Sequence, residues 1–84
     1  METFRLRETV AGMLSNDYKE RIKAEYYQLK IRYTSLCRIL DKIDNKELDF
    51  TPLTPVEMLK QQAEIMHHYM KILEARAEIE RIDL

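Results

Sequence analysis

The feature that most constrains this chain is a pair of long segments without glycine or proline, each carrying an apolar stripe at helical spacing. Each segment has about 28 residues, so as a helix it would form a rod of about 40 Å. The apolar residues alternate in steps of four and three, which places them on one helix face. The first stripe comprises Ile22, Tyr26, Leu29, Tyr33, Leu36, Leu40 and Ile43, and the second comprises Val56, Leu59, Ala63, Met66, Met70, Leu73 and Ala77.

Two rods of equal length with matching stripes predict an antiparallel helical hairpin, because each stripe is the surface that the other needs to cover. Residues 16–45 and 55–82 are the predicted long helices, and residues 46–54 are the connector. In this register the numbers of facing residues sum to about 99, which brings Leu40 near Leu59 and Tyr26 near Leu73. We therefore expect an all-α fold in a single domain, residues 1–84.

Local signals mark where these helices begin. The cluster Ser15-Asn16-Asp17 predicts the start of the first, because these side chains can accept bonds from free backbone amides and Glu20 follows Asp17 by three positions. Thr54, Pro55 and Glu57 predict a capping box at the start of the second. In the connector, the apolar residues Phe50 and Leu53 are expected to fold back over the open end of the core.

Residues 1–15 carry a loose helical pattern that includes Phe4, Leu6 and Val10, and Gly12 weakens it near its end. A helix of about three turns is too short to be stable alone in water. We expect it to dock on the hairpin or on a neighbouring subunit.

Composition excludes several classes of protein. Fourteen basic and fifteen acidic residues leave a net charge of -1, whereas a protein that coats nucleic acid carries a strong basic excess. No apolar run approaches the length of about 18 residues that would suggest a membrane span, and no signal peptide is recognisable. The chain is therefore expected to be cytoplasmic, without general nucleic-acid or membrane binding.

A second apolar stripe runs beside the core stripe of the later helix, and a two-helix hairpin can cover only one stripe. The N-terminal helix could cover part of it, but about 15 residues cannot shield a rod of about 40 Å. We therefore favour a helical-bundle homo-oligomer, a dimer or higher, that buries this stripe. Its predicted interface residues are Met58, Ile65, Tyr69, Ile72 and Ile79.

No arrangement of residues indicates catalysis, a cofactor or a metal. Glu64 and His67 have the Glu-x-x-His spacing of di-iron bundles, yet they lie on a stripe that is charged throughout, so a solvated face is the better interpretation. Cys37 is the only cysteine, and a buried, inert thiol is the usual state of a helical cysteine in such a place. The chain is not expected to be an enzyme.

Tyrosines and lysines interleave on the first long helix, a pattern that suits stacking on a base and contact with a phosphate. The alternative is that the rings are core residues whose hydroxyls reach the edge. Two polar residues interrupt the second stripe, where they would either fix the register between subunits or grip a ligand. The candidate ligand-binding residues are Lys23, Tyr26, Tyr27, Lys30, Gln62 and Arg76.

The stretch from Asp17-Tyr18-Lys19-Glu20-Arg21 to Leu84 resembles a family of small phage-encoded helical hairpins related to a crAss-like phage protein. The resemblance covers about four fifths of the chain. It is carried by Leu48-Asp49-Phe50-Thr51-Pro52 in the turn and by Leu59, Gln62, Met66, Tyr69, Leu73, Arg76, Ala77 and Ile79 beyond it. More remotely, the plan of a short helix followed by a hairpin is similar to phage sponge proteins of the anti-CBASS and anti-Thoeris kind.

Those sponges form closed oligomers and hold cyclic nucleotide immune signals between subunits, so the resemblance implies the same type of site here. We therefore expect a phage anti-defence protein that sequesters a nucleotide-derived signal in the host cytoplasm without catalysis. The alternative is a protein-binding inhibitor or structural adaptor that acts through the apolar stripe around Ile65 and Ile72.

Overall fold

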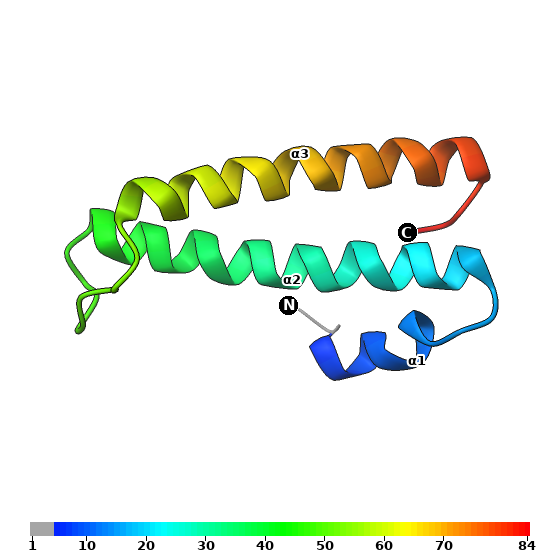
Figure 1. Cartoon of the computed structure of the whole chain (residues 1–84), viewed down its shortest axis with the longest axis horizontal. Helices are drawn as coiled ribbons and strands as arrows, with labels where there is room; N and C mark the ends of the chain where they lie inside the picture. Colours follow the sequence, from blue (N-terminus) through cyan, green and yellow to red (C-terminus); the bar gives the residue numbers. More distant parts are fainter. Residues whose placement is uncertain (1–4) are drawn as a thin grey trace.

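The computed structural model describes residues 5–84, and every regular element in that range is helical (Figure 1), which confirms the predicted all-α class. The predicted helix residues 1–4, including Phe4, lie outside the described residues. The elements are the short 3-10 helix η1 (Leu6–Thr9), α1 (Val10–Met13), α2 (Tyr18–Asp44) and α3 (Val56–Glu80).

The helices α2 and α3 lie side by side and antiparallel over their whole length (Figure 1). The Tyr18 hydroxyl donates to Oε1 of Glu80 at 2.7 Å, and the Tyr26 hydroxyl donates to Oε2 of Glu74 at 2.8 Å. The numbers of these facing residues sum to 98 and 100, which confirms the predicted register.

The start of α2 follows the prediction and the start of α3 does not. Asp17 caps α2, because its carboxylate accepts the backbone N–H of Lys19 at 3.0 Å. At α3 the predicted capping box is wrong: the N-cap is Pro55, with an extended backbone at ψ 142° and no side-chain cap. Thr54 therefore lies one residue too early, and the carbonyl oxygen of Pro55 accepts the amides of Met58 and Leu59.

Both long helices end with a basic residue in the left-handed conformation, at φ 58° for Lys46 and for Arg81. In each case the next residue donates its N–H back across the last turn, as in a Schellman motif. The bonds are Glu47 to Lys42 at 2.8 Å, Lys46 to Ile43 at 3.1 Å, Ile82 to Ala77 at 2.8 Å and Arg81 to Glu78 at 3.4 Å. After α3 the turn directs Ile82 and Leu84 onto the core, where both are partly buried.

The segment formed by η1 and α1 docks on α2, on the side away from α3 (Figure 1). Its contact with α2 is close at Gly12, where an added Cβ would lie 2.9 Å from the Cβ of Ala24 and 3.3 Å from the carbonyl oxygen of Glu20. Among the described residues, neither η1 nor α1 contacts α3. The N-terminal segment therefore leaves the second stripe of α3 uncovered.

The core is concentrated at one end of the hairpin, which we call the packed half: residues 18–30 of α2 and 66–80 of α3. The open half comprises residues 31–44 and 56–65, and there only Ala63 is buried among the described residues. The buried residues of the packed half are Ile22, Ala24, Tyr26, Leu29, Met66, Met70, Leu73 and Ala77.

The connector does not close the open half in the predicted way. Phe50 and Leu53 are 59% and 103% exposed, so the prediction that they fold over the core is wrong. The connector extends beyond the helix ends (Figure 1), and these two side chains remain in solvent. Leu48 and Pro52 instead lie half-buried beside Ile43.

Candidate functional site

Four of the predicted ligand-binding residues lie within two turns of α2. The Tyr26 and Tyr27 rings meet edge to face with their centroids 5.4 Å apart, and Nζ of Lys30 lies 6.0 Å from the centroid of Tyr26. Tyr26 is 7% exposed, so its ring belongs to the core. Tyr27 is half-buried and packs against the same core, and Lys30 is exposed. A lysine ammonium therefore lies near two tyrosine rings, and the buried Tyr26 contacts both of its neighbours.

Lys23 lies one turn before this cluster and faces another surface. It lines a hollow of about 280 Å³ between the N-terminal segment and α2, together with Glu8, Thr9, Gly12 and Glu20. Two of these neighbours are acidic, so Lys23 is surrounded by groups that reduce its attraction for an anion.

Gln62 and Arg76 lie far from the α2 cluster in the single chain. Both are exposed on α3, and at about 1.5 Å per residue they are about 21 Å apart along its axis. In the part of the chain that the structure describes, neither side chain makes a hydrogen bond or an ion pair. One chain alone therefore does not bring all six predicted residues together.

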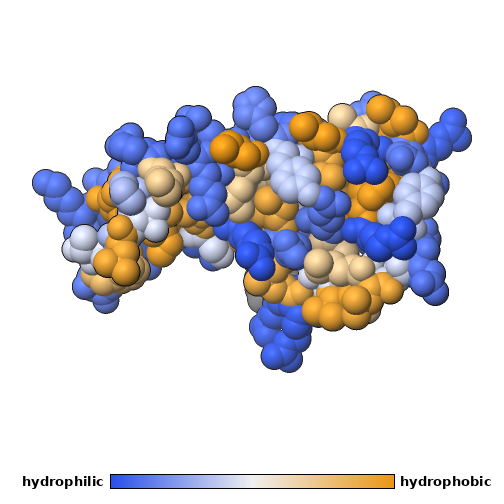
Figure 2. Space-filling view, viewed as in Figure 1, coloured by the Kyte–Doolittle hydropathy of each residue, from blue (hydrophilic) through white to orange (hydrophobic). Residues whose placement is uncertain are grey.

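The predicted interface residues of α3 are open to solvent. Met58, Ile65, Tyr69, Ile72 and Ile79 are between 40% and 81% exposed. In Figure 2 hydrophobic side chains follow α3 along its length, and a second group covers the N-terminal segment. A row of exposed apolar residues this long is unusual on the surface of a protein that acts alone.

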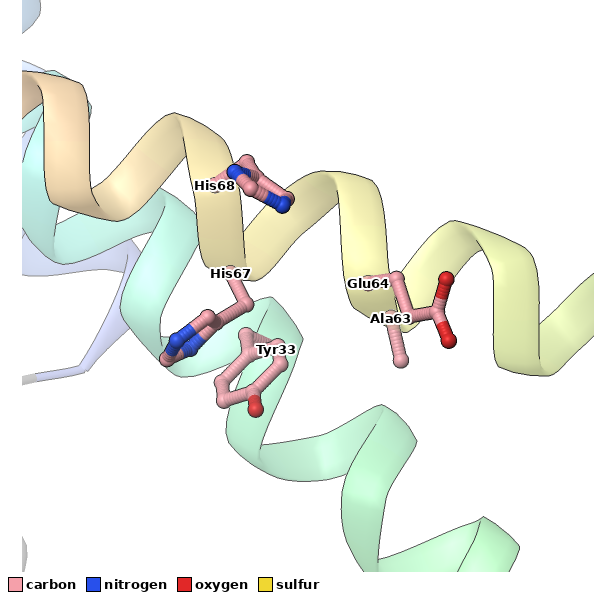
Figure 3. Close-up of a pocket in the computed structure, with 5 residues that line it drawn as sticks. All are labelled: Tyr33, Ala63, Glu64, His67 and His68. Carbon is pink, nitrogen blue, oxygen red and sulfur yellow. The ribbon is translucent and has the colours of Figure 1, made fainter.

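A hollow of about 330 Å³ lies where the packed and open halves meet, and its lining includes residues from both long helices. The ring centroids of Tyr33 on α2 and His67 on α3 are 6.0 Å apart, with their planes inclined by 38°. Figure 3 shows these two rings next to one another, with Ala63 and Glu64 one turn away on α3. His68 completes the lining at the outer margin.

This hollow belongs to a longer surface that we call the aromatic edge. Spacings of four and three place Tyr26, Lys30, Tyr33 and Cys37 on one stripe of α2, and Glu64, His67, Lys71 and Glu74 on one stripe of α3. The Tyr26 to Glu74 hydrogen bond and the Tyr33 to His67 ring contact join the two stripes.

Hydrogen bonds along the aromatic edge fix which groups donate and which accept. Burial and the bond to Glu74 raise the pKa of Tyr26 to about 12, and the same bond lowers the pKa of the Glu74 carboxyl. Interaction with the Cys37 thiol raises the pKa of Tyr33. These tyrosines therefore remain neutral near pH 7, where their hydroxyls can donate and their rings carry no charge.

The acidic and basic groups of α3 are only partly paired with one another. Nζ of Lys71 lies 3.4 Å from Oε1 of Glu74, the ion pair of the described residues. Glu64 has no hydrogen bond or ion pair within residues 5–84, so its two oxygens are open acceptors. Over the same range no group of three or more His, Cys, Asp or Glu side chains is placed to hold a metal ion.

Sequence reasoning considered Glu64 and His67 only as metal ligands or as a solvated face. It left Tyr33 open between a core residue and a ring that stacks on a base. The hollow could have been found from the register of the two long helices, in which the numbers of facing residues sum to about 99. Applied to His67, the sum of about 99 points to the neighbourhood of Tyr33 on the opposite helix.

Comparison with known proteins gives one family. The family model described as Sequestin matches residues 16–79, which include all of α2, the connector and most of α3. No curated protein and no solved structure matches the chain. Within the described residues no helix is both long enough and apolar enough to cross a membrane.

Proposed function

This chain belongs to the Sequestin family, and we propose that it is a phage anti-defence protein that binds and withholds a nucleotide-derived immune signal without turning it over. The family match is the observation that carries this proposal, because the name Sequestin indicates a sequestering, non-catalytic binding role. The ligand class and the phage context come from the resemblance to sponge proteins described above.

The chemistry of α2 supports a ligand with flat rings and negative charge. Lys30 is exposed and lies over the edge of the core at Tyr26, and the half-buried Tyr27 meets Tyr26 edge to face, so rings and a cation lie close together on α2. An aromatic face stacks on any base, and an ammonium group attracts phosphate. In this proposal Lys23 adds positive charge one turn earlier on the same helix.

The open stripe of α3 supports a site that is completed by a second copy. Met58, Ile65, Tyr69, Ile72 and Ile79 form the proposed interface, and no element of the described chain covers them. Gln62 and Arg76 interrupt this stripe, where they would meet the partner and read the polar edge of a ligand held at the boundary.

Thermal melts against a panel of cyclic di- and trinucleotides test the proposal. A ligand that binds only the folded state at about 100 times its Kd contributes about 2.7 kcal/mol, which raises Tm by several degrees in a domain of this size. Mass spectrometry after heat release should recover the ligand intact. A Tm that no nucleotide changes, or a ligand recovered as a cleavage product, would contradict sequestration.

Arg76→Ala separates a role in binding from a role in assembly, and Arg38→Ala on the exposed surface of α2 is the matched control. If Arg76 grips the ligand, its variant loses the Tm increase and keeps the mass of the wild-type assembly in light scattering. Loss of the assembly itself would instead assign Arg76 to the register between subunits.

The second candidate is a protein-binding module, either an inhibitor or an adaptor, and the exposed stripe of α3 favours it directly. Methionine, tyrosine and isoleucine suit a face that fills a hydrophobic groove. A stable monomer whose Tm responds to no nucleotide would support this candidate. In that case Ile65→Asp would abolish binding to the protein partner without changing the helical content.

A further inference from the structure

We propose that the hollow between Tyr33 and His67 is a base-binding subsite that takes one purine ring bearing an exocyclic amino group. This inference rests on the proposed function for the class of ligand, and it deepens that function by naming the contacts of the base. Neither ring of the hollow belongs to the ligand-binding residues predicted from the sequence.

The size and lining of the hollow fit a single ring system. Its volume of about 330 Å³ is near the lower limit of about 300–1,000 Å³ for small-molecule sites, so it suits one base better than a whole dinucleotide. The buried Ala63 gives it a small apolar floor, and Tyr33 and His67 form an aromatic wall. A planar ring would bury its face against that wall.

Glu64 gives the hollow a preference among bases. Glu64 lines the hollow one turn before His67 on α3, and its carboxylate points away from the two rings toward the start of α3 (Figure 3). Its side chain has no hydrogen bond or ion pair within the described chain. Carboxylate oxygens only accept hydrogen bonds, so they favour a base edge that offers an amino group and disfavour one that offers carbonyl oxygens. An amino-bearing purine therefore has both the larger stacking surface and the matching edge.

The positions of the lysines orient the ligand along the aromatic edge. Lys30 precedes Tyr33 by one turn on α2, and Lys71 follows His67 by one turn on α3. Because the helices are antiparallel, both steps lead toward the packed half, so the two lysines lie at the same level beyond the hollow. A base in the hollow would thus direct its sugar phosphate toward these two cations.

The native thiol provides a reporter for this site. Cys37 is the only cysteine of the chain, lies one turn beyond Tyr33 and interacts with its hydroxyl. A base stacked on Tyr33 would hinder alkylation of Cys37 by iodoacetamide. AMP, purine riboside 5′-monophosphate, UMP and ribose 5-phosphate are the probes, and the first two differ only in the amino group.

Calorimetric titration of the full chain with AMP, together with the alkylation rate of Cys37, tests the assignment. AMP should slow alkylation severalfold, whereas ribose 5-phosphate should not. Tyr33→Leu should weaken AMP binding about tenfold or more, since stacking on an aromatic side chain contributes strongly to base affinity. Tyr33→Phe keeps the ring and should retain binding. The helical circular dichroism of each variant checks that it folds.

Glu64→Gln is the sharper variant, because Glu64 is exposed and its replacement leaves the core unchanged. It should weaken AMP binding about fivefold or more and leave purine riboside 5′-monophosphate unaffected, since the affected contact is a charge-assisted hydrogen bond. Glu57→Gln, in the first turn of α3, is the matched control and should change neither ligand.

The outcomes separate this inference from the proposed function. If cyclic nucleotides raise Tm but the Tyr33 and Glu64 variants bind them like the wild type, the subsite assignment is overturned and sequestration stands. If AMP protects Cys37 while no cyclic nucleotide raises Tm, the subsite stands and the proposed function falls. If no probe changes either measurement, both are overturned, and tighter binding of UMP than AMP would overturn the purine preference.

Discussion

The packed and open halves of the hairpin follow the same heptad pattern but differ in what covers them. Leu73 in the packed half is 1% exposed, whereas Leu59, two heptads earlier on the same helix, is only half-buried. The packed half also has the N-terminal segment on α2 and the C-terminal residues Ile82 and Leu84 on its core. Pairing two helices therefore shields a stripe only in part, and a further element is needed to exclude water.

This difference predicts unequal losses when the stripe is truncated. Leu73→Ala should lower the free energy of unfolding by about 3 kcal/mol, because a fully buried leucine loses both transfer energy and contacts around the cavity. Leu59→Ala should cost about 1 kcal/mol, since much of its surface is already in water. Urea unfolding at one protein concentration measures both, and equal losses would show that something covers the open half in solution.

Gly12→Ala tests whether the docked N-terminal segment maintains the packed half. The new Cβ would meet the Cβ of Ala24 at 2.9 Å. Overpacking of about 1–3 kcal/mol outweighs a gain of about 1 kcal/mol in helix propensity, so a net loss of about 1 kcal/mol is expected.

Ala24→Gly removes the opposing methyl group and supplies the matched background for this change. In that background Gly12→Ala should be neutral or stabilising, and the difference is measured by a double-mutant cycle in urea. Equal effects of Gly12→Ala in the two backgrounds would contradict the close approach.

The two left-handed residues at the helix ends should respond alike, although they lie in different halves. Lys46→Gly and Arg81→Gly each relieve a strain of about 1–2 kcal/mol, offset by about 0.5–1 kcal/mol for the greater freedom of glycine in the unfolded chain. A small rise in Tm is expected for both variants. A rise for only one would show that packing around Ile82 changes the balance.

A pH dependence is also expected from Tyr26 in the packed half. Its pKa rises from 10.0 in the unfolded chain to about 12 in the fold, so its contribution is fully present below about pH 10. Between about pH 10 and about pH 12 the unfolded chain loses the proton first, and the contribution is lost.

Thermal melts across that pH window measure the contribution. Tyr26→Phe should flatten the fall of Tm with pH more than Tyr18→Phe does, because Tyr18 is exposed and its pKa is raised mainly by its hydrogen bond to Glu80. An unchanged slope in Tyr26→Phe would contradict the assignment.

Much of the hairpin is predictable from the sequence because its signals are local or periodic. The stripes predict two helices and their register, and the carboxylate of Asp17 predicts the first cap. The wrong predictions concern the start of α3 and the connector, where the backbone conformation of a few residues determines the structure. Thr54 is not a cap because Pro55 adopts an extended ψ of 142°, and no hydrophobic pattern reports the direction in which the connector carries Leu53.

The candidate site is harder to predict because it depends on contacts between helices. Residue types on α2 predict rings beside a cation, and in the structure Nζ of Lys30 lies 6.0 Å from the ring centroid of Tyr26. They do not reveal that the hydroxyl of Tyr26 is bonded to Glu74, nor that Tyr33 and His67 form one wall of a hollow. Those facts require the register to be applied to charged positions as well as to apolar ones.

The register also determines the order in which the chain can close. Contacts nearest the connector join residues close in sequence, but they belong to the open half, whereas Tyr26 and Glu74 are 48 residues apart and Tyr18 and Glu80 are 62 apart. Each doubling of loop length adds only about 0.6 kcal/mol to the entropic cost of closing the loop. Sequence separation is therefore a small cost compared with the free energy gained by burying apolar side chains. Zippering from the connector would therefore release little energy until Leu29 and Met70 meet, and the folding nucleus would lie in the more distant contacts.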